Sequence, residues 1–206
     1  MSGARRDHAF VTDPAQNRTV IARKPDALEP PSEGIVLERL RTEATLWINA
    51  VHLQAARIGR RHTEQYSEPE EITAVEVDLH FFLVALVRLR RCVSRVGLNV
   101  LVLCKSLDRL VSTFDSQVPS LRKLRNVSEH IDEYNLDEGH DSSVSRQEVQ
   151  TWAMGTSEDG GLIWHWLGEA FDVRGAHEAA TVFYREFLSE CDAHIARLRT
   201  GDIAHG

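Results

Sequence analysis

The sequence contains few cysteines, and the three that it has, Cys92, Cys104 and Cys191, lie far apart without a C-x-x-C pair. This spacing argues against a zinc ribbon and against a disulfide framework. Cysteines of this kind are typical of reduced packing residues. We therefore expect a cytoplasmic protein that binds no metal through its cysteines.

Long apolar runs are also missing from the sequence. The opening residues, MSGARRDHAFVTDPAQ, contain no apolar stretch of the kind that a secretory signal needs. The segment DLHFFLVALV is strongly apolar, but it would cross about half of a bilayer at about 1.5 Å per residue. The sequence predicts a buried helix there and no association with a membrane.

Positive charge is in deficit, because 24 lysines and arginines stand against 31 acidic residues and give a formal net charge of -7. A dedicated binder of duplex DNA normally carries an overall positive field, which this chain does not have. Any contact with nucleic acid would therefore have to be local.

The pattern that is present is helical. Apolar residues recur at steps of three and four, which places them on one face of a helix. Proline in SEPEE and Pro119 favour helix starts, and Gly97 with Asn99 favours a break. The expected helices cover residues 35–66, then from SEPEE at 67–71 to 96, and 100–114, 121–134 and 175–198.

The pattern changes before the last of these helices. The segments EVQTWAM and GLIWHWLG are rich in aromatic and β-branched residues and flank the turn-like GTSEDGG, which predicts a small β-hairpin. The sequence thus predicts a mainly α protein, an antiparallel helical bundle of about five helices with a hairpin insertion. We expect a flexible tail over 1–33, the bundle over 34–136, and a loop, the hairpin and a C-terminal helix over 137–206.

The clearest candidate site lies in LRKLRNVSEHIDEY, residues 121–134. Asn126 and His130 are one helical turn apart, and so are Arg125 and Glu129, but Arg125 and His130 diverge by about 140°. One straight helix therefore does not bring Arg125 and His130 onto one substrate. A distorted helix or a second copy of the chain could do so.

Other interpretations of this region stay open. Arg125 and Glu129 could form an ordinary exposed ion pair worth a few tenths of a kcal/mol, with His130 at the edge of the apolar face. A metal site from His130, Asp132, His140 and Asp141 matches no familiar spacing. Tryptophans in WHW and Trp152 could stack on bases, or they could fasten the hairpin to the bundle.

The R-N-x-x-x-H pattern of Arg125, Asn126 and His130 on a late helix of a bundle resembles the HEPN superfamily. The resemblance implies RNA cleavage by a homodimer without a metal or another cofactor. It implies His130 as the proton-transfer group, Arg125 as the phosphate clamp and Asn126 as an orienting hydrogen bonder.

Neighbouring charges bear on RNA binding. Arg122 and Lys123 extend the motif into a basic cluster that could contact RNA, together with Arg88, Arg90, Arg91 and Arg95. The acidic stretch EHIDEYNLDEGHD would repel a phosphate backbone unless it points elsewhere. The rival hypothesis is a noncatalytic helical module that binds another protein, such as an inhibitor, or a second copy of itself. A small-ligand sensor built on the tryptophans is a third.

Overall fold

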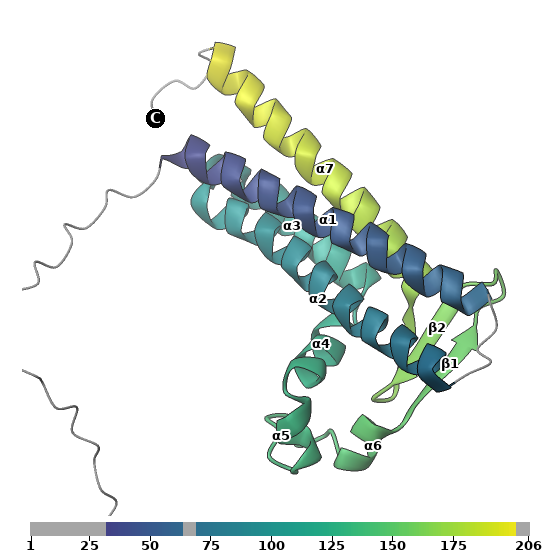
Figure 1. Ribbon diagram of the computed structural model, residues 1–206. Helices are drawn as coiled ribbons and strands as arrows, with labels where there is room; N and C mark the ends of the chain where they lie inside the picture. The colour runs from purple at the N-terminus through teal and green to yellow at the C-terminus, as the bar shows by residue number, and fades with distance from the viewer. Residues whose placement is uncertain (1–31, 64–68, 201–206) are drawn as a thin grey trace, which may run out of the picture. The chain divides into compact units, whose positions relative to one another are not determined.

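The computed structural model describes residues 32–63 and 69–200 (Figure 1). Residues 1–31 of the predicted tail, the predicted end of the first helix at 64–66, and residues 201–206 lie outside this part. The described residues form seven α-helices, one 3-10 helix and three strands. These are α1 Glu33–Thr63, α2 Pro69–Asn99, η1 Leu101–Leu103, α3 Cys104–Gln117, α4 Leu121–Glu129, α5 Ile131–Asn135, α6 Arg146–Gln150, β1 Trp152–Thr156, β2 Leu162–Trp166, β3 Glu169–Asp172 and α7 Val173–Thr200.

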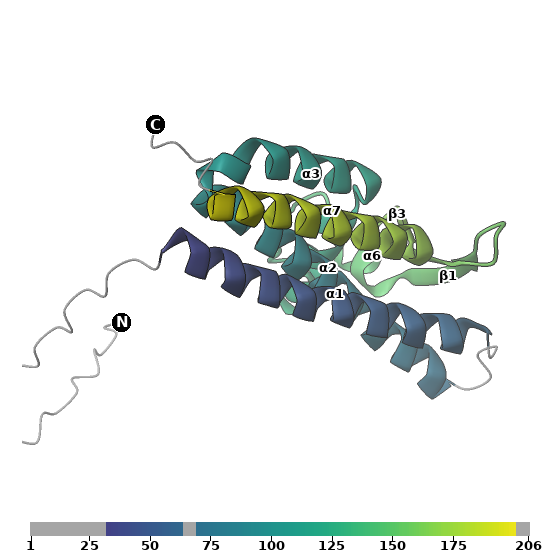
Figure 2. The ribbon, with the colours of Figure 1, turned by 90° about the horizontal axis from the view of Figure 1, so that it is seen from above.

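The four long helices α1, α2, α3 and α7 lie side by side in Figures 1 and 2. α2 packs against α1, α3 and α4, and its apolar stripe, including Leu79, Leu86 and Val93, is completely buried. The prediction of a mainly α bundle is confirmed. None of the helices in the described ranges is both long enough and apolar enough to cross a bilayer.

The β element before α7 is also confirmed, but it has three strands instead of two. The strands pair antiparallel in the order β1-β2-β3. Two residues, Leu167 at φ 55° and Gly168 at φ 75°, connect β2 to β3. Positive φ at both central residues matches a type I′ turn, which suits the twist of a tight hairpin.

The sheet packs its inner face on the bundle. Trp164 and Phe171 are paired across β2 and β3, and both are almost fully buried. The facing Met154 of β1 is half-buried. The alternate residues of β2 point to the opposite face, where His165 is exposed and Ile163 is half-buried. This alternation explains why an aromatic-rich segment forms strands here.

The predicted helix over 121–134 is interrupted. α4 ends at Glu129, His130 adopts φ -120° and ψ 30°, and α5 begins at Ile131. The break leaves the backbone N–H of His130 bonded to the Val127 carbonyl, three residues back, at 3.2 Å.

The segment EVQ, expected to open the hairpin, belongs instead to the short helix α6. Ser145 and Glu148 form a capping box, in which each side chain bonds the backbone N–H of the other residue. The capped turn satisfies backbone donors at the helix start, so the strand begins only at Trp152. In Figure 1, α4, α5 and α6 project below the long helices.

Candidate functional site

Two of the three motif residues, Arg125 and Asn126, line a cavity of about 480 Å³. The cavity lies between α2, the α3–α4 connection and α4. Its other lining residues are Val87, Arg90, Asp115, Val118, Pro119, Leu121 and Arg122. Three arginines thus face one hollow, against a single carboxylate.

That carboxylate is already paired. Asp115 on α3 accepts hydrogen bonds from Nε and Nη2 of Arg90 at 2.5 Å each. The two bonds to Asp115 raise the pKa of Arg90 above its usual value. Arg90 and Asp115 neutralise each other, and Arg125 is paired with Glu129. Among the described arginines that line the cavity, Arg122 is therefore the one without an ion-pair partner.

Arg125 has partners within its own helix. It forms an ion pair with Glu129, one turn further on, and its Nη1 donates to Asn126 Oδ1 at 3.3 Å. The Nε of Arg125 is buried without a hydrogen-bond partner. The predicted i, i+4 ion pair is present, and one donor of the guanidinium remains unused.

His130 stands at the break between α4 and α5. Its Nδ1 lies 3.0 Å from Glu133 Oε1, in α5, and its side chain is 41% exposed. The ring of His140 meets that of His130 edge-on, with centroids 5.9 Å apart. A carboxylate on Nδ1 fixes the tautomer and leaves Nε2 as the nitrogen that can exchange a proton with a substrate.

The structure does not bring Arg125 and His130 together within one chain. No hydrogen bond or ion pair joins these two described residues, and His130 is not among the residues that line the cavity. The break in the helix therefore does not bring the side chains of Arg125 and His130 together. A phosphate held at the cavity would need its histidine from elsewhere.

The two predicted RNA contacts, Arg122 and Lys123, have different surroundings. Arg122 is exposed at the cavity. Lys123 turns toward the sheet, where its Nζ donates to the Leu167 carbonyl at 2.8 Å and lies 3.1 Å from Glu169 Oε1. Its charge is thus used within the protein.

The alternative ligand sites gain little from the structure. In the described ranges, no group of three or more His, Cys, Asp or Glu side chains is arranged to hold a metal ion. Trp164 and Trp166 stack on each other, with centroids 4.9 Å apart, and are 1% and 3% exposed. These two tryptophans fasten the sheet to the bundle, and their faces are not open to bases.

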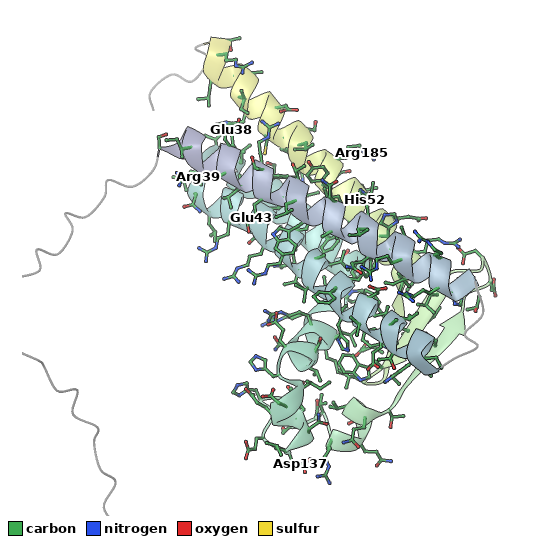
Figure 3. All side chains as sticks on the ribbon, in the orientation of Figure 1. Glu38, Arg39, Glu43, His52, Asp137 and Arg185 are labelled. Atoms are coloured by element: carbon green, nitrogen blue, oxygen red, sulfur yellow. The ribbon has the colours of Figure 1, made fainter. Side chains whose placement is uncertain are left out.

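The acidic stretch after the motif leads away from the long helices. Figure 3 shows Asp137 at the far end of the α5 region, remote from α1 and α2. Asp137 lies 3.8 Å from Arg146, and Glu133 faces both His130 and His140. Part of the negative charge is therefore balanced locally.

Sequence reasoning missed His80, which contacts the motif from α2. Its Nδ1 lies 2.5 Å from Ser128 Oγ, and its ring meets Trp164 and Trp166 edge-on. Burial lowers the pKa of His80. No spacing rule links residues 80 and 128, so the sequence carries no signal for this contact. Glu133, three residues after His130, could have been found from helical spacing.

Comparisons with protein-family models, curated proteins and solved structures give no match for this chain. The resemblance to the HEPN superfamily therefore continues to rest on the three motif residues and on the helical architecture.

Proposed function

We propose that this protein is a metal-independent ribonuclease that acts as a homodimer. The observation that carries the proposal is the hydrogen-bond geometry of His130. Glu133 holds Nδ1 at 3.0 Å, and the ring is partly open to solvent at a helix break. A histidine that is oriented by a carboxylate and partly exposed to solvent is suited to proton transfer.

The reaction that fits this chemistry is attack of a ribose 2′-oxygen on the adjacent phosphorus. Nε2 of His130 takes the proton from the 2′-OH as the new O–P bond forms. The bond from phosphorus to the 5′-oxygen breaks, a 2′,3′-cyclic phosphate forms, and the leaving oxygen receives a proton from water. No electron donor or acceptor is needed, and negative charge develops on the phosphoryl oxygens.

The cavity beside α4 suits the binding of that charge. Arg122 and Arg125 face it together with Asn126, and Asp115 is already paired to Arg90. Arginine presents a fixed fork of donors that matches phosphate oxygens.

The proposal requires two copies of the chain, because Arg125 and His130 of one copy share no contact. In a two-fold dimer, the same patch of each copy faces its counterpart. If α4 lies in that interface, His130 of one copy can approach the cavity of the other. The dimer then contains two equivalent sites, and each combines the cavity of one copy with His130 of the other.

The test is cleavage of single-stranded RNA by purified protein in excess EDTA. We expect His130→Ala to lower the rate by about 10² to 10⁴, as is typical for loss of a positioned proton-transfer group. Arg125→Ala should also remove most of the activity. His165→Ala and Arg185→Ala are matched controls, since both residues are exposed and lie on β2 and α7.

Absence of cleavage across varied RNAs, or cleavage that persists in both motif variants, refutes the ribonuclease proposal. A noncatalytic interaction module is then the better function. One observation favours it, because Glu129 and Asn126 already occupy the guanidinium of Arg125. In that case the role of Arg125 is to stabilise α4 through these two contacts.

A further inference from the structure

Three arginines, Arg88, Arg91 and Arg95, lie on the exposed face of α2. Their spacing of three and four places them in one row along the helix. All three are exposed, whereas the opposite face of the same helix, with Leu86, is buried. We call Arg88, Arg91 and Arg95 the arginine row.

Two members of the arginine row, Arg91 and Arg95, lack the carboxylates that accompany other arginines in the part of the chain that the structure describes. Arg57 and Arg61 both face Asp78. Among the described residues, by contrast, no acidic side chain lies within ion-pair distance of Arg91 or Arg95. Like charges one turn apart on a helix cost about 0.2 to 0.5 kcal/mol per pair. Arg91 and Arg95 therefore form no ion pair that would stabilise the protein.

The neighbouring helix α1 does little to change the positive charge of the arginine row. Arg88 lies over the ring of Trp47, with 5.8 Å from its Cζ to the ring centroid, and Glu43 accepts a hydrogen bond from Trp47 at 3.4 Å. Figure 3 shows Glu43 and Arg39 on the same part of α1. One carboxylate near Arg88 is thus offset by a further exposed arginine.

The row begins at the edge of the cavity. Val87, which lines the cavity, lies one turn before Arg91 on α2. From Val87 to Arg95 the helix rises about 12 Å. A negatively charged chain that enters the cavity at Arg122 and Arg125 can therefore continue along α2 without leaving a positive surface.

We propose that the arginine row binds the backbone phosphates of single-stranded RNA on one side of the phosphate held in the cavity. This inference rests on the proposed function, because that function supplies RNA as the ligand. Guanidinium groups bind phosphates regardless of base, so the row should add affinity and set the direction of the strand without reading sequence.

The experiment measures binding separately from cleavage. A fluorescent oligouridine is titrated in EDTA with His130→Ala protein, and its anisotropy is followed at several salt concentrations. Loss of two phosphate contacts in R91Q/R95Q should reduce the slope of log K against log salt by about 1.4, since each contact to a single strand contributes about 0.7. The affinity should fall at least about tenfold at low salt.

The matched control is R185Q/R199Q, which removes two exposed arginines from α7 and changes the net charge equally. Figure 3 shows Arg185 on α7. The control should keep the slope and the affinity of the His130→Ala protein. Both double variants should keep the thermal unfolding midpoint of the His130→Ala protein, because the substituted side chains are exposed.

An unchanged affinity and slope in R91Q/R95Q overturns the inference, and so does an absence of RNA binding. If R91Q/R95Q instead weakens the dimer in sedimentation while RNA affinity stays constant, the row is a protein interface and the inference is wrong. The ribonuclease proposal is judged on cleavage alone. Binding along the row without cleavage refutes that proposal and leaves the row as an RNA surface.

Discussion

Lys123 Nζ donates a hydrogen bond to the backbone carbonyl of Leu167, a residue other than glycine that holds φ at 55°. A positive φ is unfavourable for a branched side chain, so this turn needs support from its surroundings. The lysine and the burial of Leu167, which is 3% exposed, supply it. α4 is thereby fixed to the sheet two residues before Arg125, the first residue of the R-N-x-x-x-H motif.

Lys123→Met should lower the free energy of unfolding by about 1 to 3 kcal/mol, because it leaves the partly buried Leu167 carbonyl without its donor. Urea denaturation monitored by circular dichroism measures the change. Arg122→Met is the control, since the neighbouring side chain is exposed and should change stability by no more than about 0.5 kcal/mol. Equal effects of the two substitutions would show that Lys123 is not a structural tie.

The buried carboxylate of Asp78 gives a prediction about additivity. Its oxygens lie 3.1 Å from Arg57 Nε and 3.3 Å from Arg61 Nε. Arg57→Gln or Arg61→Gln alone should cost about 1 kcal/mol, because the other arginine still faces the charge. The double variant should cost about 3 to 5 kcal/mol, since it leaves a buried carboxylate uncompensated.

The double-mutant cycle for Arg57 and Arg61 is measured by denaturant unfolding. Adding Asp78→Asn to the double variant should restore part of the loss, because it removes the buried charge. Strict additivity of the two arginine substitutions would contradict the shared-partner arrangement.

His80 predicts a dependence of stability on pH. Burial holds its folded pKa below the unfolded value of about 6.5, so the unfolded chain binds more protons in the window below that pH. The contribution of His80 to stability is thus present above about pH 6.5 and is lost as the pH falls toward the folded pKa. Unfolding free energies measured from pH 7.5 down to about 5 should show this slope.

His80→Gln should flatten that slope, since glutamine can still bond Ser128 but does not titrate. Glu76 lies 3.9 Å from His80 Nε2, and burial raises its pKa. This raised pKa favours the folded state at lower pH and opposes the effect of His80. The free energy of unfolding is therefore compared between wild type and His80→Gln at each pH. Identical slopes in wild type and His80→Gln would refute the assignment.

Gly139 should not tolerate a side chain. A Cβ at this position would lie 2.2 Å from Cδ1 of the buried Tyr134 ring. Gly139→Ala should therefore destabilise the protein by about 1 to 3 kcal/mol through overpacking. Gly59→Ala, in an exposed part of α1 with open space around it, should stabilise by about 0.4 to 1 kcal/mol. Thermal unfolding of both variants tests the opposite signs.

The long helices could be predicted because their apolar periodicity is strong enough to dominate local preferences. The interruption at His130 could not, since HIDEY continues the helical spacing and contains neither glycine nor proline. The third strand was missed because Leu167-Gly168 is an unusual sequence for a tight turn. The capping box of Ser145 and Glu148 was readable, and it marks α6.

For the candidate site, helical geometry alone predicted that Arg125 and His130 diverge, and the structure leaves them without a contact. The ion pair of Arg125 with Glu129 followed from the same spacing. The engagement of Lys123 with Leu167 could not be read from the sequence, because it depends on how the sheet packs against α4. The same holds for His80 and Ser128.

The interruption at His130 also separates short helices that should open by local unfolding from long helices that should open only when the whole protein unfolds. α5 and α6 are five residues long each, and isolated helices below about 12 residues are marginal in water. Their amide hydrogens should exchange with solvent through local unfolding, while those of α2 should need global unfolding. Arg125 and Asn126 belong to α4, which packs on α2, whereas Glu133, the partner of His130, belongs to the segment that opens first. In the proposed ribonuclease, proton transfer by His130 would thus be subject to a fast local equilibrium that leaves Arg125 and Asn126 in place.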